Sequence, residues 1–141
     1  MHEDENADMS AAGSIDPLSL CRHGDAATLD RRALDRLREL DPHGRQGLLQ
    51  RVLRTYVASL TAQLETIEAA NGRGDVRQLR FTVHALKSSS AAVGALALSE
   101  GCAEIEHFLR DRERMPAAAT IDALVTQGHA VLAAVGDILA A

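Results

Sequence analysis

The sequence predicts an all-α fold, namely an antiparallel, up-down-up-down four-helix bundle with a short additional N-terminal helix. Of its 141 residues, 46% are apolar but only 2% are aromatic, and Trp is absent, so the core has to be built from Leu, Val, Ile and Ala. Apolar residues recur at helical spacing along most of the chain. Short connections between the long helical stretches favour antiparallel neighbours, and the length suits one domain.

Residues 1–27 are expected to form a mobile acidic tail, followed by one helical domain at 28–141. The tail mixes Asp, Glu, Ser, Gly and Pro with few large hydrophobic residues, too little apolar surface to offset the entropy of ordering. Thr28 is a candidate N-cap for a short first helix, which ends at Asp41-Pro42 because proline disfavours helix in the residue before it. The apolar positions of this helix are Leu29, Ala33, Leu34, Leu37 and Leu40.

A second, long helix is expected to open with Asp41 as cap and Pro42 at the first helical position. It ends at the sequence Asn-Gly-Arg-Gly of residues 71–74, where the glycines interrupt the pattern. One apolar stripe along it predicts the residues that face the core: Leu49, Val52, Leu53, Tyr56, Val57, Leu60, Leu64 and Ile67.

Three further helices are delimited by capping and breaking residues. Asp75 caps a third helix that Gly94 weakens, a fourth ends in the charged run 110–114, and a fifth begins near Thr120. The predicted core positions of these helices are Leu79, Val83, Leu86, Ser90, Val93, Leu98, Cys102, Ile105, Leu109, Ile121, Leu124, Val125, Gly128, Leu132, Val135 and Leu139.

Composition argues against several classes of function. The formal net charge of −5 and the scarcity of aromatic rings disfavour nucleic-acid binding. Cys21 and Cys102 lie far apart with no CxxC spacing, which argues against a zinc site or a disulfide and fits a reducing compartment. No run approaches 18 apolar residues, and the N-terminus is acidic, unlike a signal peptide. We therefore expect a cytoplasmic protein with no membrane contact, and a monomer.

Residues 84–95, HALKSSSAAVGA, carry the candidate site on the exposed face of the third helix. At about 100° per residue, His84, Lys87 and Ser88 share a narrow arc with three further residues, Arg77, Arg80 and Ala91, opposite the apolar stripe. Residues 76–99 contain three basic side chains and no acidic one, which predicts a local positive patch. A neutral imidazole is a competent nucleophile toward phosphorus, and Lys87, about 4.5 Å further along the axis, can meet phosphoryl oxygens. Ser88 can donate a hydrogen bond to the same oxygens.

HALKSSSAAVGA resembles the motif of the histidine-containing phosphotransfer (HPt) domains of bacterial phosphorelays, approximately His-x-Leu-Lys-Gly-Ser-(Ser/Ala)-x-x-x-Gly-(Ala/Leu). The His, Leu, Lys, Ser, Gly and Ala positions match in register. Ser88 stands where the family usually has glycine. The glycine lets a partner approach closely, so we expect serine at this position to affect the affinity or choice of partner. A looser resemblance extends from about Leu29 to Leu139.

The resemblance implies an exposed phosphorylated histidine, His84, in a four-helix bundle that shuttles phosphoryl groups between aspartates of receiver domains. Lys87 and Ser88 would assist, with no ATP site, no kinase activity of the chain's own and no cofactor. The partners would be receiver domains of response regulators or of a hybrid sensor kinase. The candidate docking residues are Arg77, Arg80, Phe81, Ala91 and Gly94, although Phe81 equally suits a core position and Gly94 equally suits helix packing.

The sequence bears on four other interpretations. A helical adaptor that binds a receiver without carrying phosphate remains open. A sensor-kinase dimerisation domain is weakened because Ala85, not an acidic residue, follows His84. Glu104 and His107 form one Glu-x-x-His step, whereas di-iron bundles need two such steps and two more glutamates, so no metal site is expected. The three serines lack a coupled base in a nucleophile elbow, which excludes a hydrolase of that kind.

Overall fold

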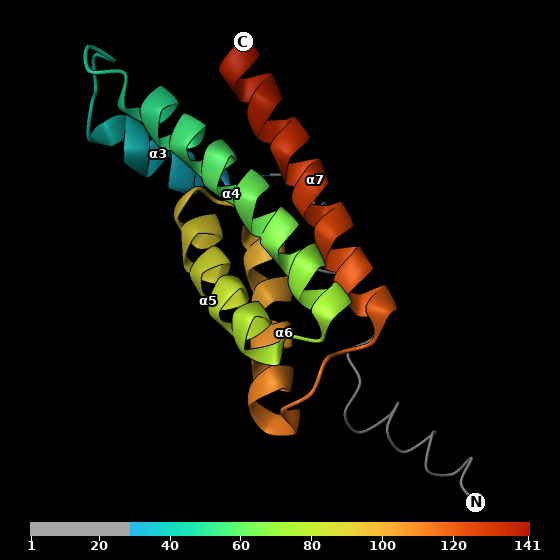
Figure 1. Ribbon diagram of the computed structural model, residues 1–141. Coiled ribbons are helices and arrows are strands. Elements are labelled where there is room, and N and C mark those ends of the chain that lie inside the picture. Colours follow the sequence, from blue (N-terminus) through green and yellow to red (C-terminus); the bar gives the residue numbers. More distant parts are fainter. Residues whose placement is uncertain (1–28) are drawn as a thin grey trace, which may run out of the picture.

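A computed structural model describes residues 29–141, which form five helices joined by short loops (Figure 1). The helices are α3 (Arg31–Glu39), α4 (Leu48–Arg73), α5 (Val76–Ala92), α6 (Leu96–Arg112) and α7 (Ala118–Ala140). The predicted tail at residues 1–27, the candidate cap Thr28 and Cys21 lie outside the described residues.

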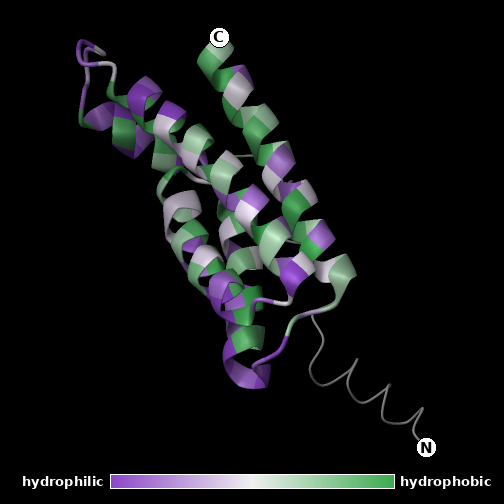
Figure 2. Ribbon diagram, in the orientation of Figure 1, coloured by the Kyte–Doolittle hydropathy of each residue, from purple (hydrophilic) through white to green (hydrophobic). Residues whose placement is uncertain are grey.

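Helices α4 to α7 form the predicted four-helix bundle, and α3 is the short additional helix. Helix α4 packs against α5 and α7, while α6 packs against α5 and α7, so the four helices enclose one core. Helix α3 packs against α4 at one end of the bundle (Figure 1). Figure 2 shows the expected division of each helix into hydrophobic and hydrophilic positions.

The core consists of the aliphatic stripes that the sequence predicts. The largest fully buried side chains, with less than 2% of their surface exposed, are Leu53, Leu60, Leu64, Ile67, Leu79, Leu86, Leu98, Ile105, Leu109, Ile121 and Leu124. A buried hydrogen bond of 2.8 Å joins the Tyr56 hydroxyl to Ser90 Oγ and so connects α4 to α5. Burial raises the pKa of Tyr56 to about 12, which keeps this hydroxyl protonated.

The predicted start of the second helix was wrong. Helix α4 begins at Leu48, not at Pro42, because Gly44 and Gly47 adopt positive φ angles of 66° and 60° that a helix cannot contain. Asp41 still acts as a cap, but from a distance in sequence. Its carboxylate accepts hydrogen bonds of 3.1 Å from the backbone N–H groups of Gln46 and Leu48. The first helix also starts later than predicted, with Asp30 at its N-cap position.

The other predicted boundaries are close to those observed. Helix α4 ends at Arg73 with Gly74 in the left-handed conformation, and the Asp75 side chain caps α5 by accepting a 3.0 Å hydrogen bond from Gln78 N–H. Helix α7 begins at Ala118, slightly before the predicted Thr120. Among the described residues, α7 alone has the length and apolar composition to span a membrane, but a core helix passes the same test, and α7 contributes buried residues to the bundle.

Candidate functional site

His84 lies in the middle of α5, on the face opposite the core. Helical periodicity buries Leu79, Val83 and Leu86 completely, and the same periodicity leaves the His84 side chain 64% exposed. The predicted solvent-facing position of this imidazole is therefore present in the structure.

A carboxylate from the neighbouring helix reaches the imidazole. Glu106 of α6 places Oε2 2.5 Å from His84 Nδ1, and its other oxygen, Oε1, accepts a 2.6 Å hydrogen bond from Lys87 Nζ. The Glu106 side chain is only 13% exposed. A histidine, a lysine and a glutamate thus form one cluster, in which a single carboxylate holds both partners.

This carboxylate changes the charge expected at the site. Residues 76–99 do contain no acidic residue, but α6 supplies one in space, so the patch around His84 is less positive than predicted. Partial burial of Glu106 acts to raise its pKa, but hydrogen bonds from Lys87 and His84, together with their charges, outweigh burial. The pKa of Glu106 therefore lies below the ordinary carboxyl value of 4.5, and Glu106 is ionised at neutral pH.

The contact with Glu106 selects one tautomer of neutral His84. An ionised carboxylate can only accept hydrogen bonds, so Nδ1 must carry the proton. The lone pair of the ring then belongs to Nε2, the nitrogen that does not contact Glu106. The cluster therefore leaves Nε2 as the ring nitrogen with an available lone pair.

Lys87 is anchored more firmly than a surface lysine. Its side chain is 34% exposed and shares the Glu106 carboxylate with His84. Its backbone carbonyl also accepts a 2.9 Å hydrogen bond from Ser99 Oγ, at the start of α6. Side chain and backbone of Lys87 both tie α5 to α6.

The three serines after Lys87 have different surroundings. Ser88 is exposed on the His84 face. Ser89 is half-buried and donates a 3.2 Å hydrogen bond to the carbonyl of Leu86, and Ser90 is fully buried in the bond to Tyr56. Only Ser88 is available to a molecule that approaches His84.

Most of the predicted docking residues are exposed. Arg77, Arg80 and Ala91 face solvent, and Phe81 is 72% exposed, so it is not a core residue. An exposed aromatic ring offers apolar contact area to a partner.

Gly94 does not belong to this exposed face. It is buried at the turn between α5 and α6, with a φ of 87°, and its carbonyl accepts a 2.8 Å hydrogen bond from Asp30 N–H. A Cβ at this position would lie 2.9 Å from the backbone N and O of Asp30. The structure therefore assigns Gly94 to the packing of the chain ahead of α3 against the turn, not to a docking surface.

His107 and Cys102 do not form a second candidate site in the described part of the chain. His107 Nε2 lies 3.0 Å from Asp111, and its Nδ1 lies 2.9 Å from Arg110. Within residues 29–141, no group of three or more His, Cys, Asp or Glu side chains could hold a metal ion. Cys102 is a free thiol in the core, where burial raises its pKa.

Comparison with known proteins places the chain among phosphotransfer domains. The model of the Hpt domain family matches residues 51–138. Two solved structures are similar. Histidine-containing phosphotransfer protein B (HptB) from Pseudomonas aeruginosa PAO1 has 29% identity and a TM-score of 0.65, over 79% of this chain and 90% of that one. The HPT domain of the Hpt sensor hybrid histidine kinase from Shewanella has 26% identity and a TM-score of 0.66, over 82% and 97%. No curated protein matches the sequence.

Proposed function

Since this chain belongs to the Hpt domain family, whose members have a general role in histidine phosphotransfer, we propose that His84 carries the phosphoryl group. The observation that supports this most strongly is the contact between His84 Nδ1 and the Glu106 carboxylate. It leaves Nε2 of an exposed ring as the nucleophile.

The proposed reaction moves one phosphoryl group between two aspartates. The Nε2 lone pair attacks the phosphorus of an aspartyl phosphate on a receiver domain, the N–P bond forms, and the bond from phosphorus to the aspartate oxygen breaks. The leaving group is the aspartate carboxylate, so no proton has to be delivered to it. The same steps in reverse pass the group to an aspartate of a second receiver, and no ATP is consumed on this chain.

Glu106 and Lys87 balance the charges that this transfer creates. Once Nε2 is bonded to phosphorus, the ring that keeps its Nδ1 proton is cationic, and the Glu106 carboxylate stabilises it through a charge-assisted hydrogen bond. In this structure Lys87 Nζ donates a hydrogen bond to Glu106. Rotation about the bonds of the flexible lysine side chain can move Nζ toward the phosphoryl oxygens.

Receiver domains are the proposed partners, and the exposed face of α5 is the proposed docking surface. Arg77, Arg80 and Lys87 attract the acidic pocket that surrounds the aspartate of a receiver, an effect that weakens as salt rises. Ser88, Ala91 and Phe81 provide the close contact around the ring. Monomeric state and a cytoplasmic location remain predictions.

The proposal is tested by a relay reconstituted with two receivers. One receiver is phosphorylated with labelled phosphate, the full chain is added, and a second receiver follows. We expect a label on the chain that is labile in acid and stable in base, and its passage to the second receiver. His84→Gln should fold normally and accept no label. A chain that binds receivers but never becomes labelled would be an adaptor without phosphotransfer.

A further inference from the structure

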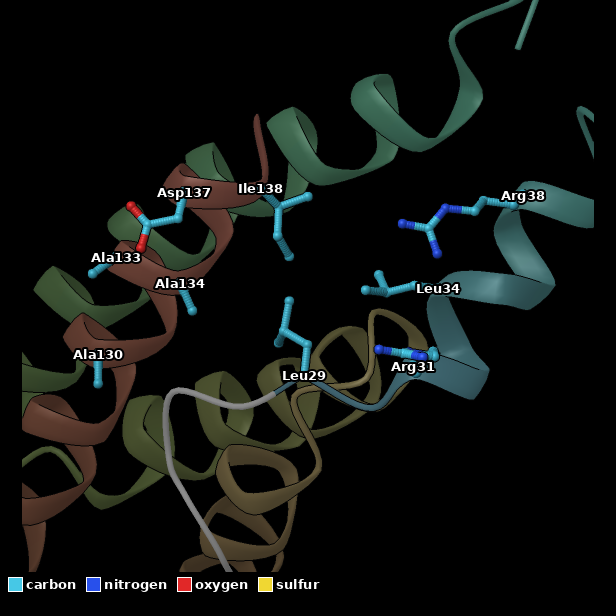
Figure 3. A pocket seen from close by; sticks show the side chains of 9 residues that line it. All are labelled: Leu29, Arg31, Leu34, Arg38, Ala130, Ala133, Ala134, Asp137 and Ile138. Atoms are coloured by element: carbon cyan, nitrogen blue, oxygen red, sulfur yellow. The ribbon is translucent and has the colours of Figure 1, made fainter. Parts of the chain in front are cut away.

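A groove separates α3 from the C-terminal half of α7, away from the His84 site. Its volume is about 500 Å³. Leu29, Leu34 and Ile138 point into it, as Figure 3 shows. Ala130, Ala133 and Ala134 complete its apolar lining, while Arg31, Arg38 and Asp137 add charge at its sides.

The groove exists because two helices pack on a common neighbour without filling the space between them. Both α3 and α7 pack against α4. The last turns of α7 extend past α5 and α6 and are mostly hydrophobic (Figures 1 and 2). Aliphatic surface that lies open in this way favours an occupant, since its removal from water stabilises the complex.

We propose that the groove binds a segment of this same chain, residues 15–21, with the sequence IDPLSLC. Residues 1–28 contain only three branched aliphatic residues, Ile15, Leu18 and Leu20, and all three fall within this segment. They match the aliphatic lining contributed by Leu34 and Ile138. The composition predicts an acidic tail over residues 1–27, and the proposal assigns residues 15–21 of it to the groove.

The charges of the segment and the groove are complementary. Residues 1–28 carry six acidic residues and one basic residue. Asp16 lies within the segment and can pair with Arg31 or Arg38, whereas Arg22, directly after it, matches Asp137 on the opposite side of the groove. Pairs of this kind set the orientation of an apolar segment more than its affinity.

The stretch that links the segment to Leu29 has a suitable length for binding in the groove. Leu29, the first described residue, is itself part of the groove lining. The segment is therefore tethered to the chain at the groove. The nine Cα–Cα steps from Leu20 to Leu29 span up to about 30 Å when extended, whereas α3, with nine residues, is about 14 Å long. The segment can therefore turn back along the groove, and the tether makes its binding intramolecular.

The test uses a spin label on Cys21 of the full chain. Cys102 is completely buried, so a thiol-reactive nitroxide labels Cys21 alone. We expect the methyl NMR signals of Leu34 and Ile138 to lose intensity and to recover when the nitroxide is reduced. Ile67, near the far end of α4, should keep its intensity.

Two variants and one mixed sample decide the outcome. Leu18→Asp with Leu20→Asp should abolish the intensity loss, whereas the matched control Ala11→Asp with Ala12→Asp, which adds the same charge outside the segment, should retain it. The proposal is overturned if the labelled chain shows no loss at Leu34 and Ile138, or if Leu18→Asp with Leu20→Asp keeps it. Loss in a mixture of spin-labelled chain and separate isotope-labelled chain would identify a second copy as the occupant and also overturn it. None of these readouts depends on phosphotransfer.

Discussion

Replacement of Glu106 by Gln should slow phosphorylation of His84 without unfolding the bundle. The substitution keeps the size of the side chain but removes the charge that Nδ1 of His84 and Nζ of Lys87 share at 2.5 and 2.6 Å. A hydrogen bond to a charged group contributes about 1.5–3 kcal/mol. Because the His84 side chain is 64% exposed, solvent reduces this to roughly 1–2 kcal/mol in the transition state. The rate should therefore fall about 5- to 30-fold.

The assay compares two phosphodonors. Transfer from a phosphorylated receiver requires docking, whereas transfer from phosphoramidate requires only the imidazole, so an effect through Nε2 should appear with both. Glu65→Gln is the matched control, since it removes the same charge from an exposed position on α4, and it should react at the wild-type rate. Glu106→Gln at the wild-type rate with both donors would refute the role given to the carboxylate.

Stability measurements at several pH values distinguish the loss of the Glu106 charge from a loss of packing in Glu106→Gln. The pKa of Glu106 is lowered in the folded protein, so the stability gained from its ionised form is present above the ordinary carboxyl value of 4.5. It is lost as the pH falls through the lowered value. The difference in unfolding free energy between the wild type and Glu106→Gln should therefore disappear on acidification, as measured by urea titrations at several pH values. A difference independent of pH would indicate lost packing instead of lost charge.

Three further predictions concern neighbouring residues. Lys87→Ala should slow transfer without abolishing it, because the activation free energy rises by roughly 0.5–2 kcal/mol. A wild-type rate at low salt in a stopped-flow assay would show that Lys87 links α5 to α6 but does not assist transfer. Ser88→Trp should block exchange with a receiver yet leave phosphoramidate reactivity and helical content intact, whereas Ser88→Gly should preserve or speed exchange; wild-type exchange by the Trp variant would place the docking surface elsewhere. Gly94→Ala should destabilise the fold by about 1–3 kcal/mol or more in urea titrations, because of its positive φ and the contact with Asp30. Gly72→Ala, within α4 and with open space around the new Cβ, should not; equal stability of the two variants would contradict this reasoning.

Helical periodicity was sufficient to predict most of the fold. The stripe from Leu53 to Ile67 and the one from Leu79 to Val93 each lie in the core because one helical face must be buried. The loop at residues 40–47 was missed because Asp41-Pro42 is a common helix start. The glycines that prevent a helix there, Gly44 and Gly47, are informative only through their φ angles.

The exposed half of the site was predictable, whereas its carboxylate was not. The position of His84 follows from the periodicity of its own helix, but the contact with Glu106 depends on how α5 and α6 are rotated against each other. One signal was available in the sequence. His84 and Glu106 lie at nearly equal distances from the turn at Gly94, and positions equidistant from the turn of an antiparallel helical pair lie level.

The central claim, that Nε2 of His84 carries the phosphoryl group, is tested most directly by NMR. The full chain, labelled with ¹⁵N at histidine, is phosphorylated with phosphoramidate, and the ³¹P–¹⁵N coupling identifies the bonded nitrogen. The account predicts one phosphorylated histidine, His84, with phosphorus on Nε2 and a proton on Nδ1. Phosphorus on Nδ1 of His84, or on His43, His107 or His129 in its place, would contradict it.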